Sequence, residues 1–342
     1  MTHCDGQACD LLILGAGAAG AAAAIQARRH GLSVVLLEAR LKRGARPGET
    51  LHPGVEPILA ALGVDGAALA ASTLRHEGIW IEWDGPRRFV PYGSDEKGPW
   101  RGFQIDRARL DAILLDAAVA AGARLLRPLA PRGVLREAGR VAGVLAGNRE
   151  IRARHTLDAT GRRAWLAREL GLAPERRSPP WRLRFGWTAE PRGAGPEEPV
   201  IRAAPGGWDW QAPLGDGRQA WVTLRMPDAA ESRSQHAASF AWRIHRACAG
   251  PGYFLLGDAA QILDPASSHG ILRALMSGML VAHLAAGCKR HDLPEVAAQV
   301  QYRTWIDRQF EADVAALTEL YARHPGGLAR QLAPATSAVA FA

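Results

Sequence analysis

The opening of the chain restricts the possible fold more than any other segment. Residues 10–38 read as an apolar strand, the glycine turn GAGAAG, an alanine-rich helix and a second apolar strand that ends at Glu38. In such a unit the glycines permit a tight turn and a close approach of the backbone to pyrophosphate, and the helix N-terminus stabilises the phosphates. The sequence therefore predicts a dinucleotide site with Glu38 at the ribose hydroxyls. The remaining predicted ligands all lie in the turn: Gly15, Gly17, Ala18, Ala19 and Gly20.

A second segment near the other end of the chain decides between NAD and FAD, which the turn alone leaves open. Residues 253–270, YFLLGDAAQILDPASSHG, read as an apolar strand, the pair Gly257-Asp258, a turn and the start of a helix. The Asp258 carboxylate at the strand end can hold a polyol hydroxyl. The positive end of the following helix favours the negative charge that develops on a reduced flavin. The two segments together predict FAD, and the alternative for Asp258 is a helix cap.

Charge and composition exclude several other classes of protein. The net charge is +8 and the sequence pI is about 9.9, but the basic residues are scattered and are almost all arginine. We therefore expect attraction of an anionic cofactor or an acidic partner surface, and no nucleic-acid binding. Outside the alanine-rich helix no run of about 18 uncharged apolar residues occurs, so no membrane span is expected. The N-terminus lacks a basic signal region and the four cysteines form no CxxC, which predicts a cytoplasmic protein without a metal site.

The rest of the pattern indicates an α/β fold. Apolar residues at helical spacing predict helices at 106–121, 268–287 and 295–322. Short alternating segments predict an antiparallel ribbon at 132–158 and a second antiparallel sheet at 181–226. We expect a Rossmann-like FAD-binding domain, a small antiparallel β-sheet substrate domain and C-terminal helices.

The predicted domains are interleaved along the sequence. The FAD-binding domain is expected to be discontinuous and to comprise residues 8–72, 100–172 and 250–290. The β-rich substrate domain comprises residues 73–99 and 173–249, and a C-terminal helical segment and tail follow at 291–342.

Three motifs resemble those of a known flavoprotein group. GAGAAG with Glu38, DATGRRAWLAR at 158–168 and GDAAQILDPASSHGI at 257–271 are together similar to the flavoprotein monooxygenases that include para-hydroxybenzoate hydroxylase, tryptophan halogenases and geranylgeranyl reductases. The resemblance covers most of the chain and implies a glutathione-reductase-type FAD domain. It implies that Asp158 and Gly161 lie near the FAD pyrophosphate and that Asp258 contacts the ribityl chain. The other cofactor contacts that it implies are Arg107, Gly257, Pro265, Gly270 and Ile271.

Two segments test the halogenase branch of this group. GGWDWQAPL at 206–214 is similar to the halogenase WxWxIP signature with Ala212 in place of isoleucine, and Trp208 and Trp210 would project from one face of a strand towards substrate. Arg75 stands where the resemblance leads us to expect the lysine that halogenases need. Because a guanidinium cannot form a lysine chloramine, halogenation is disfavoured. Arg75 is then a candidate substrate contact, with a solvated loop arginine as the alternative.

Three further segments resemble a narrower group. GETLHPGVEPILAALGV at 48–64, RHEGIWIEW at 75–83 and GPWRGFQIDRARLD at 98–111 look like the flavoprotein maturases of the LodB and GoxB type, which accompany cysteine tryptophylquinone-dependent amino-acid oxidases. This resemblance implies oxygenation of a tryptophan within the precursor of a partner oxidase. The stretch from Gly161 to Tyr253 offers little chain to enclose a free small molecule, so we expect an open site that suits a protein substrate.

The expected reaction is FAD-dependent monooxygenation of an indole group, with O2 as co-substrate. No second nucleotide motif is visible, so NAD(P)H or another reductant would visit the same flavin transiently. The alternatives are a geranylgeranyl-reductase-like reductase or dehydrogenase, a halogenase-like enzyme on a small molecule, and a non-catalytic flavin-binding assembly partner. The sequence leaves the oligomeric state open.

Three residues are candidates for catalysis. His269 precedes Gly270 at the expected flavin edge, and His52 follows Glu49 in the GETLHPG turn. An imidazole titrates near working pH and can move a proton during the reaction. The alternatives are a turn histidine bonded to the backbone and a glutamate that braces its turn. For Arg107 the alternative is a solvated helix arginine.

Overall fold

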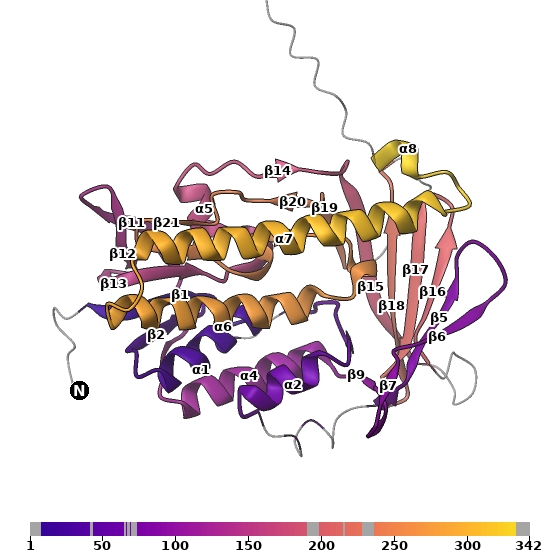
Figure 1. Cartoon of the computed structure of the whole chain (residues 1–342), viewed down its shortest axis with the longest axis horizontal. Coiled ribbons are helices and arrows are strands. Elements are labelled where there is room, and N and C mark those ends of the chain that lie inside the picture. Colours follow the sequence, from indigo (N-terminus) through magenta and orange to yellow (C-terminus); the bar gives the residue numbers. More distant parts are fainter. Residues whose placement is uncertain are drawn as a thin grey trace, which may run out of the picture.

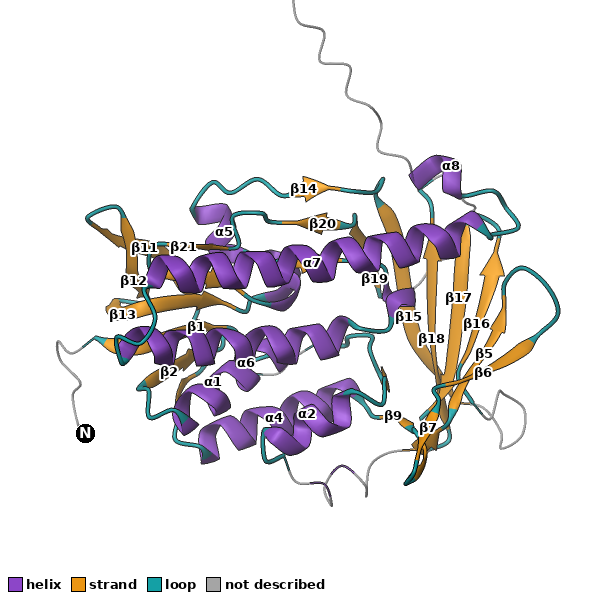
Figure 2. Cartoon of the chain, in the orientation of Figure 1, coloured by secondary structure: helices purple, strands orange, loops and turns teal. Residues whose placement is uncertain are grey.

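Two large β-sheets dominate the computed structural model, and the long helix α7 (Glu295–Ala322) runs past both of them (Figure 1). The mixed α/β architecture expected from the sequence is confirmed (Figure 2). The structure describes residues 8–41, 44–64, 66, 69, 74–189, 198–214, 216–227 and 236–332. The predicted domain boundary at 72–73 and the end of the predicted tail, 333–342, lie outside these ranges.

The first sheet is parallel along the strands that carry the cofactor motifs. These strands lie in the order β10 (Arg124–Leu126), β2 (Val34–Leu37), β1 (Cys9–Leu14), β13 (Arg149–Asp158) and β22 (Tyr253–Leu255). The first residues of β13 pair instead with β12 (Arg140–Ala146), which pairs with β11 (Pro131–Glu137), both antiparallel. A short strand, β21 (Ala249–Gly250), extends the sheet beyond β22. The opening βαβ unit and the ribbon at 132–158 are therefore confirmed.

Helices α1 (Ala18–Arg29), α4 (Arg107–Ala120) and α6 (Gly270–Lys289) lie together on one side of the first sheet (Figure 1). The small residues of α1 are explained by its contact with α6. A Cβ atom on Gly278 would lie 2.3 Å from the carbonyl oxygen of Ala19, so the two backbones meet where no side chain fits. The predictions of helices at 106–121, 268–287 and 295–322 are confirmed to within two residues at each end.

The second sheet is almost entirely antiparallel and confirms the prediction for residues 181–226. Its order is β19 (Ala237–Phe240), β15 (Trp181–Ala189), β18 (Arg218–Arg225), β17 (Gly207–Pro213), β16 (Val200–Ala204), β5 (Gly78–Glu82) and β6 (Arg88–Pro91). One face is apolar and packs against the end of α7 through Leu317 and Tyr321, with help from α8 (Ala329–Leu332). This end of the molecule therefore has its own core, centred on buried tryptophans.

Short elements connect the two sheets. β3 (Thr50–Leu51), β9 (Gly102–Gln104) and β4 (Leu74–His76) form one small sheet, and β14 (Glu175–Arg176), β20 (Arg243–Ile244) and β23 (Gln261–Ile262) form another. A hairpin joins β7 (Ser94–Asp95) to β8 (Gly98–Pro99). The short helices are α2 (Val55–Ala61), α5 (Trp165–Glu169) and the 3-10 turns η1 (Gly161–Arg163), η2 (Gly257–Ala259) and η3 (Pro265–Ser267).

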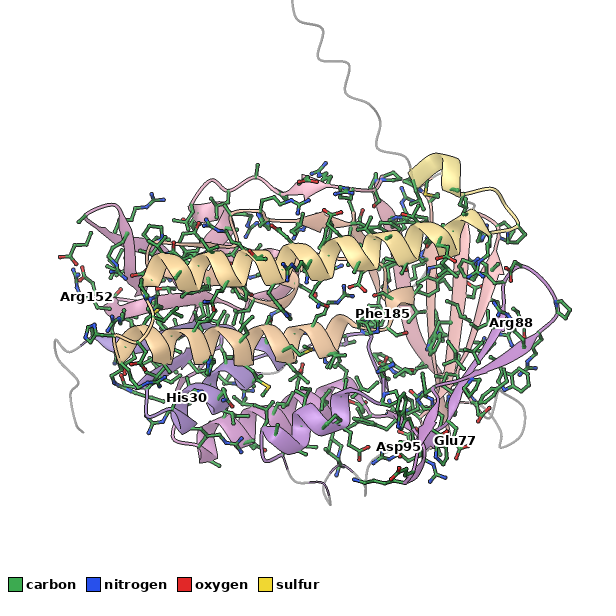
Figure 3. The ribbon with its side chains drawn as sticks, viewed as in Figure 1. His30, Glu77, Arg88, Asp95, Arg152 and Phe185 are labelled. Carbon is green, nitrogen blue, oxygen red and sulfur yellow. The ribbon has the colours of Figure 1, made fainter. Side chains whose placement is uncertain are left out.

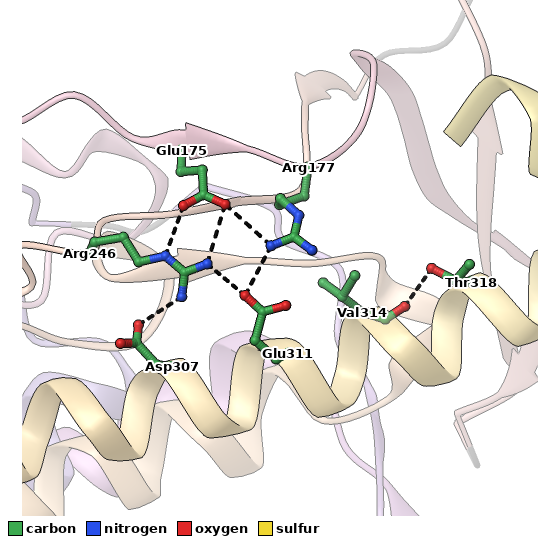
Figure 4. A network of polar contacts seen from close by, with 7 residues as sticks. All are labelled: Glu175, Arg177, Arg246, Asp307, Glu311, Val314 and Thr318. Atoms are coloured by element: carbon green, nitrogen blue, oxygen red, sulfur yellow. Dashed lines mark hydrogen bonds and ion pairs between the residues drawn. The ribbon is translucent and has the colours of Figure 1, made fainter. Parts of the chain in front are cut away.

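An ion-pair network fastens α7 to the small sheet of β14 and β20 (Figure 4). The guanidinium of Arg246 lies 3.0 Å from Asp307 and 2.6 Å from Glu311, both on α7, and 2.8 Å from Glu175. Arg177 lies 2.9 Å from Glu311 and completes the network. Its members are partly exposed, so these contacts position α7 more than they stabilise it.

α6 is the described helix that is long and apolar enough to cross a membrane. Of its most apolar window, 61% is buried inside the protein, and the helix packs against α1 and α7. Its apolar side chains therefore serve the core of the folded chain.

Candidate functional site

The predicted cofactor residues meet at one edge of the first sheet. β1, β2 and β13 end in register, with Leu14 paired to Leu37 and to Asp158. The segments that follow these ends carry Gly15 and Glu38, and Asp258 follows the end of the parallel strand β22. Ligands of open parallel sheets bind outside the carboxyl ends of the strands. The geometry thus assembles one site from four distant segments.

The glycine turn fits a pyrophosphate. Gly15 has a φ of +97°, and its Cβ would lie 2.5 Å from the carbonyl oxygen of Ala159. A Cβ on Gly20 would lie 2.0 Å from the carbonyl oxygen of Gly15, whereas a Cβ on Gly17 would meet only Arg46, at 4.0 Å. α1 begins after Gly17 without a side-chain cap, so its first N–H groups are available to an anion. Ala18 and Ala19, in its first turn, are buried.

Glu38 lies beside this turn at the end of β2. Its Oε2 accepts a hydrogen bond from the backbone N–H of Ala16 at 3.3 Å, and Oε1 accepts one from Arg40 at 3.1 Å. The residue is only 8% exposed, which fixes the carboxylate next to the glycine turn. Its predicted bond to a ribose stays a prediction, and its location fits that role.

Asp158 ends β13, and its predicted place near the FAD pyrophosphate stays a prediction. Its carboxylate is fully buried and accepts hydrogen bonds from the N–H and hydroxyl of Thr160, at 2.9 and 2.6 Å, and from the N–H of Leu166 at 2.8 Å. Burial raises the pKa of this carboxyl, and these hydrogen bonds oppose the rise. Asp158 therefore shapes the loop beside Gly15 from inside. Gly161, with a φ of +66°, continues that loop, and its contact with FAD stays a prediction.

Asp258 follows the end of β22, within the turn η2. The residue is exposed and accepts no hydrogen bond from the described residues, yet desolvation by the surrounding protein raises its pKa. The charges of Arg107, Arg162, Arg273 and Arg243 oppose that rise. An exposed acceptor with arginine charges around it fits the hydroxyls of a ribityl chain. The preceding Gly257 has a φ of +53° and packs between Ala19 and Ala274, so a larger residue would separate α1 from α6.

Arg107 faces the interior of this site and not the solvent. Its side chain is 17% exposed and lies 3.3 Å from Asp111, four residues along α4. A Cβ on Gly48 would lie 3.2 Å from the Arg107 guanidinium and 3.6 Å from the side chain of Ile271. The alternative of a solvated helix arginine is therefore wrong. Three predicted segments meet here, although contacts of Arg107 and Ile271 with FAD stay predictions.

The start of α6 carries the expected flavin edge. Pro265 and Gly270 are exposed, and Ser268, between them, has a φ of +55°. α6 begins after His269 without a side-chain cap, so its positive end is open. A helix N-terminus in this state favours negative charge in front of it.

The structure brings the two candidate histidines together. The ring centroids of His52 and His269 are 5.6 Å apart, and the ring of Tyr92 lies 5.4 Å from that of His52 on its other side. His52 Nδ1 accepts the N–H of Gly54 at 3.0 Å, which is the turn contact that the sequence leaves as an alternative. Burial lowers the pKa of His52, and the charge of His269 lowers it further. His52 is therefore neutral near pH 7 with its proton on Nε2.

Glu49 connects the GETLHPG turn, residues 48–54, to the second sheet. Its Oε2 accepts the N–H of Gly48 at 2.8 Å, and its Oε1 accepts the indole N–H of Trp187, on β15, at 3.2 Å. Burial raises the pKa of this carboxyl. Trp187 is a site residue that the sequence analysis missed. The signal for it is the alternation of Trp181, Leu183, Phe185 and Trp187 along one face of β15.

Trp208 and Trp210 share one face of β17, as predicted, but they have unlike surroundings. Trp208 is 2% exposed, and its indole N–H bonds to Asp264 at 3.2 Å and to the hydroxyl of Tyr321 at 3.0 Å. Asp264 in turn caps η3 through the N–H of Ala266. Trp208 therefore fastens the second sheet to the segment before α6. Trp210 is half-buried at the edge of the same core, and a substrate contact stays a prediction for both.

Phe185 is buried next to the site, whereas Arg75 is exposed. Figure 3 labels Phe185 between the second sheet and the start of α6, and the centroid of its ring lies 5.2 Å from that of His236, on which it stacks. Arg75 forms a bidentate pair with Glu56 of α2 at 2.9 and 2.6 Å, and its guanidinium lies 5.3 Å from the ring of Phe103. This pairing fixes Arg75 beside α2, and its contact with substrate stays a prediction.

Comparison with known proteins agrees with this geometry. Residues 10–169 match the family described as FAD dependent oxidoreductase. The fold and the cofactor site together define the protein as an FAD-dependent oxidoreductase. The family match includes the glycine turn, Glu38 and the loop after Asp158, which are the parts that the site geometry associates with the nucleotide.

Relatives of known function cover most of the chain. It is 28% identical to the digeranylgeranylglycerophospholipid reductase of Methanothrix thermoacetophila, over 81% of this chain and 78% of the relative. It is 27% identical to the menaquinone reductase of Mycolicibacterium smegmatis, over 80% and 76%. It is 25% identical to the tryptophan 2-halogenase of Chondromyces crocatus, over 80% of this chain and 60% of that enzyme. Both reductases and a halogenase are thus similar to this protein.

Solved structures confirm the fold. The myxobacterial chondrochloren halogenase CndH superposes with a TM-score of 0.85 at 20% identity, covering 97% of this chain and 87% of that one. Pseudomonas aeruginosa PqsL, in complex with 2-aminobenzoylacetate, superposes with a TM-score of 0.81 at 18% identity, covering 95% and 99%. The two-sheet arrangement joined by C-terminal helices is therefore shared with flavin-dependent halogenases and with PqsL, described as a probable FAD-dependent monooxygenase.

Proposed function

We propose that this protein is an FAD-dependent monooxygenase that hydroxylates an indole, and that the indole belongs to a tryptophan of a partner oxidase precursor during maturation of a tryptophylquinone cofactor. The observation that supports an aromatic substrate most directly is the 3.2 Å hydrogen bond from Trp187 to Glu49. It holds the aromatic face of the second sheet against the turn that borders the cofactor site. An aromatic face of this kind matches a planar apolar substrate.

Each part of the cofactor has a candidate partner in the chain. Bound FAD, once reduced, supplies the activation of O2. The glycine turn and the N-terminus of α1 would hold the pyrophosphate, and Glu38 would hold the ribose. Asp258 would hold the polyol chain, and the uncapped N-terminus of α6 would favour negative charge on the flavin. NAD(P)H or another reductant visits the same site transiently.

The substrate side is formed by the second sheet. Trp187 and Trp210 present partly buried aromatic surface over the buried ring of Phe185, and these rings exclude water from the reacting atoms. His269 and His52 lie where a proton can be held or moved beside a bound indole. Glu49, bonded to Trp187, fixes the turn at 48–54 relative to the second sheet.

A protein substrate is supported by charge and by chain length. The net charge of +8 suits an acidic precursor surface. The described residues between Gly161 and Tyr253 build mainly the second sheet and its connections, which is little chain to enclose a free small molecule. The resemblance of segments 48–64, 75–83 and 98–111 to the LodB and GoxB maturases supports the same substrate.

Mass spectrometry tests this proposal. FAD-loaded protein is reduced photochemically, mixed with oxygenated buffer and a quinone-cofactor oxidase precursor, and the precursor is then digested and mapped. The expected product carries added oxygen on one tryptophan. Free tryptophan and an FAD-free Asp258→Ala preparation serve as controls. Oxygen on free tryptophan but not on the precursor would refute the protein substrate, and an unchanged precursor and free tryptophan would refute monooxygenation.

A reductase is the second candidate, because two of the relatives are described as reductases of isoprenoid or quinone compounds. That function predicts reduced FAD that survives for minutes in air and loss of a double bond from an isoprenoid substrate. The same oxygen experiment with added bromide reports a halogenase-like activity as a brominated product. If the FAD-free protein still supports maturation of the precursor, the chain acts as an assembly partner without catalysis.

A further inference from the structure

One carboxylate of α7 points towards the candidate histidines. Asp313 lies 3.4 Å from Nδ1 of His269 through Oδ1, and its Oδ2 forms an ion pair with the guanidinium of Arg273. The Asp313 side chain is 15% exposed, whereas those of Asp307 and Glu311, six and two residues earlier on the same helix, are 39% and 44% exposed. α7 thus turns one acid inwards at the start of α6.

Arg273 holds this carboxylate in place. Its side chain is 9% exposed, and its second terminal nitrogen donates to the hydroxyl of Ser267 in η3 at 2.8 Å. Its Nε donates to the carbonyl oxygen of His269. Desolvation lowers the pKa of Arg273, and the charges of Asp313 and Asp258 oppose that change. These partners fix the Arg273 guanidinium against the Asp313 carboxylate.

The hydrogen bonds define which ring nitrogens carry protons. A carboxylate can only accept, so contact with Asp313 favours the proton of neutral His269 on Nδ1 and leaves Nε2 as a base. His52 has the opposite arrangement, because its Nδ1 accepts from Gly54. Among the described residues, the charged or titratable groups in contact with His269 are Asp313 from α7, Arg273 from α6 and His52 from the turn after β3, and Tyr92 contacts His52.

We propose that Asp313, clamped by Arg273, is a positioning residue that orients His269 as the proton-transfer group of the site. The inference rests on the proposed function, because it assumes that substrate binds in front of α6. The side chain of His269 is 40% exposed, so it is not enclosed by the contacts with Asp313 and His52. An acid on α7 that fixes the tautomer of an imidazole has the same physical effect as the aspartate of an Asp-His pair in hydrolases.

Two measurements on the FAD-loaded protein test the proposal. The first is the tautomer of His269, read from ¹⁵N histidine NMR of the wild type, Asp313→Asn and, as a control on the same helix, Asp307→Asn. The expected wild-type tautomer carries the proton on Nδ1, and Asp313→Asn shifts the population towards the Nε2 form. In His269→Gln, the pKa of His52 rises, because one of the causes that lower it is removed.

The second measurement is the pH profile of product formation. Loss of a general acid–base group costs about 10²-fold or more in rate, so we expect kcat of His269→Gln to fall by at least that factor with little change in KM. Asp313→Asn gives a smaller loss of kcat and a displaced pH profile, and Asp307→Asn behaves as wild type.

The results separate the two proposals. If no oxygenated product forms, the proposed function fails, and the NMR result still decides whether Asp313 orients His269. A wild-type tautomer with the proton on Nε2, or one that Asp313→Asn leaves unchanged, overturns the inference. Full kcat in His269→Gln overturns it as well, and this partly exposed residue can be replaced without disturbing the core.

Discussion

Asp264 is a buried acid whose ionisation should govern part of the stability of the protein. Burial raises its pKa from 3.8 to about 6, although Tyr321, Ala266 and Trp208 donate hydrogen bonds to it. Because the pKa in the folded state lies above that in the unfolded state, the folded protein binds the proton more tightly. This contribution to stability is present below about pH 4 and is lost as the pH rises to about 6. The difference in pKa corresponds to about 3 kcal/mol.

Substitution of Asp264 by asparagine removes the titration and keeps the size of the side chain. We expect the free energy of unfolding of the wild type, minus that of Asp264→Asn, to fall by about 3 kcal/mol between pH 4 and pH 7. Urea unfolding of the FAD-loaded proteins, followed by circular dichroism at several pH values, measures this difference. The control is Asp95→Asn, on the exposed β7–β8 hairpin (Figure 3). A difference that is independent of pH, or that grows with pH, would refute the reasoning.

Three further substitutions address the cofactor turn, the seam between the sheets and the surface. Gly20→Ala places a Cβ 2.0 Å from the carbonyl oxygen of Gly15. It should weaken FAD retention, measured by flavin absorbance after gel filtration. It should also destabilise the fold by about 1–3 kcal/mol, measured by thermal unfolding. Trp187→Phe removes a hydrogen bond to buried Glu49 and should lower the free energy of unfolding by about 1–3 kcal/mol. Unchanged stability would refute this expectation. Arg246→Gln breaks a partly exposed network and should lower the free energy of unfolding by less than about 1 kcal/mol. Urea midpoints at low and high salt measure this loss, which should be smaller in high salt.

The cofactor half of the site could be predicted because its determinants are local. The tight turn at Gly15 needs a positive φ, and the close approach at Gly20 leaves no room for a side chain. Each of these positions therefore requires glycine, and both glycines follow an apolar strand closely enough to be recognised in the sequence. The acids at strand ends, Glu38 and Asp258, are visible for the same reason, since the strand, the turn and the acid are contiguous.

The catalytic half could not be predicted in the same way, because its contacts join distant segments. Asp307, Glu311 and Asp313 look equivalent within the α7 sequence, and only tertiary packing turns Asp313 towards His269 while the other two pair with Arg246. The same holds for Trp187, whose partner Glu49 lies far away in the sequence. Side-chain direction in such cases depends on how the helix and sheets dock.

The local sequence around Trp208 predicts its strand and its face but not its burial. Its strand and its shared face with Trp210 follow from alternation along β17. Its burial follows from the end of α7, which covers that part of the sheet with Tyr321. A motif therefore locates an indole in the chain, but the distant helix determines whether any of its surface remains for a ligand.

The reach of α7 has a consequence for the cooperativity of folding. A helix of 28 residues is about 42 Å long, and this one contacts Arg246 near its middle and the core of the second sheet at its end. Neither sheet can lose its structure without exposing one face of the same helix. The two sheets should therefore unfold in a single calorimetric transition, as one cooperative unit that crosses the boundary between the cofactor and substrate regions.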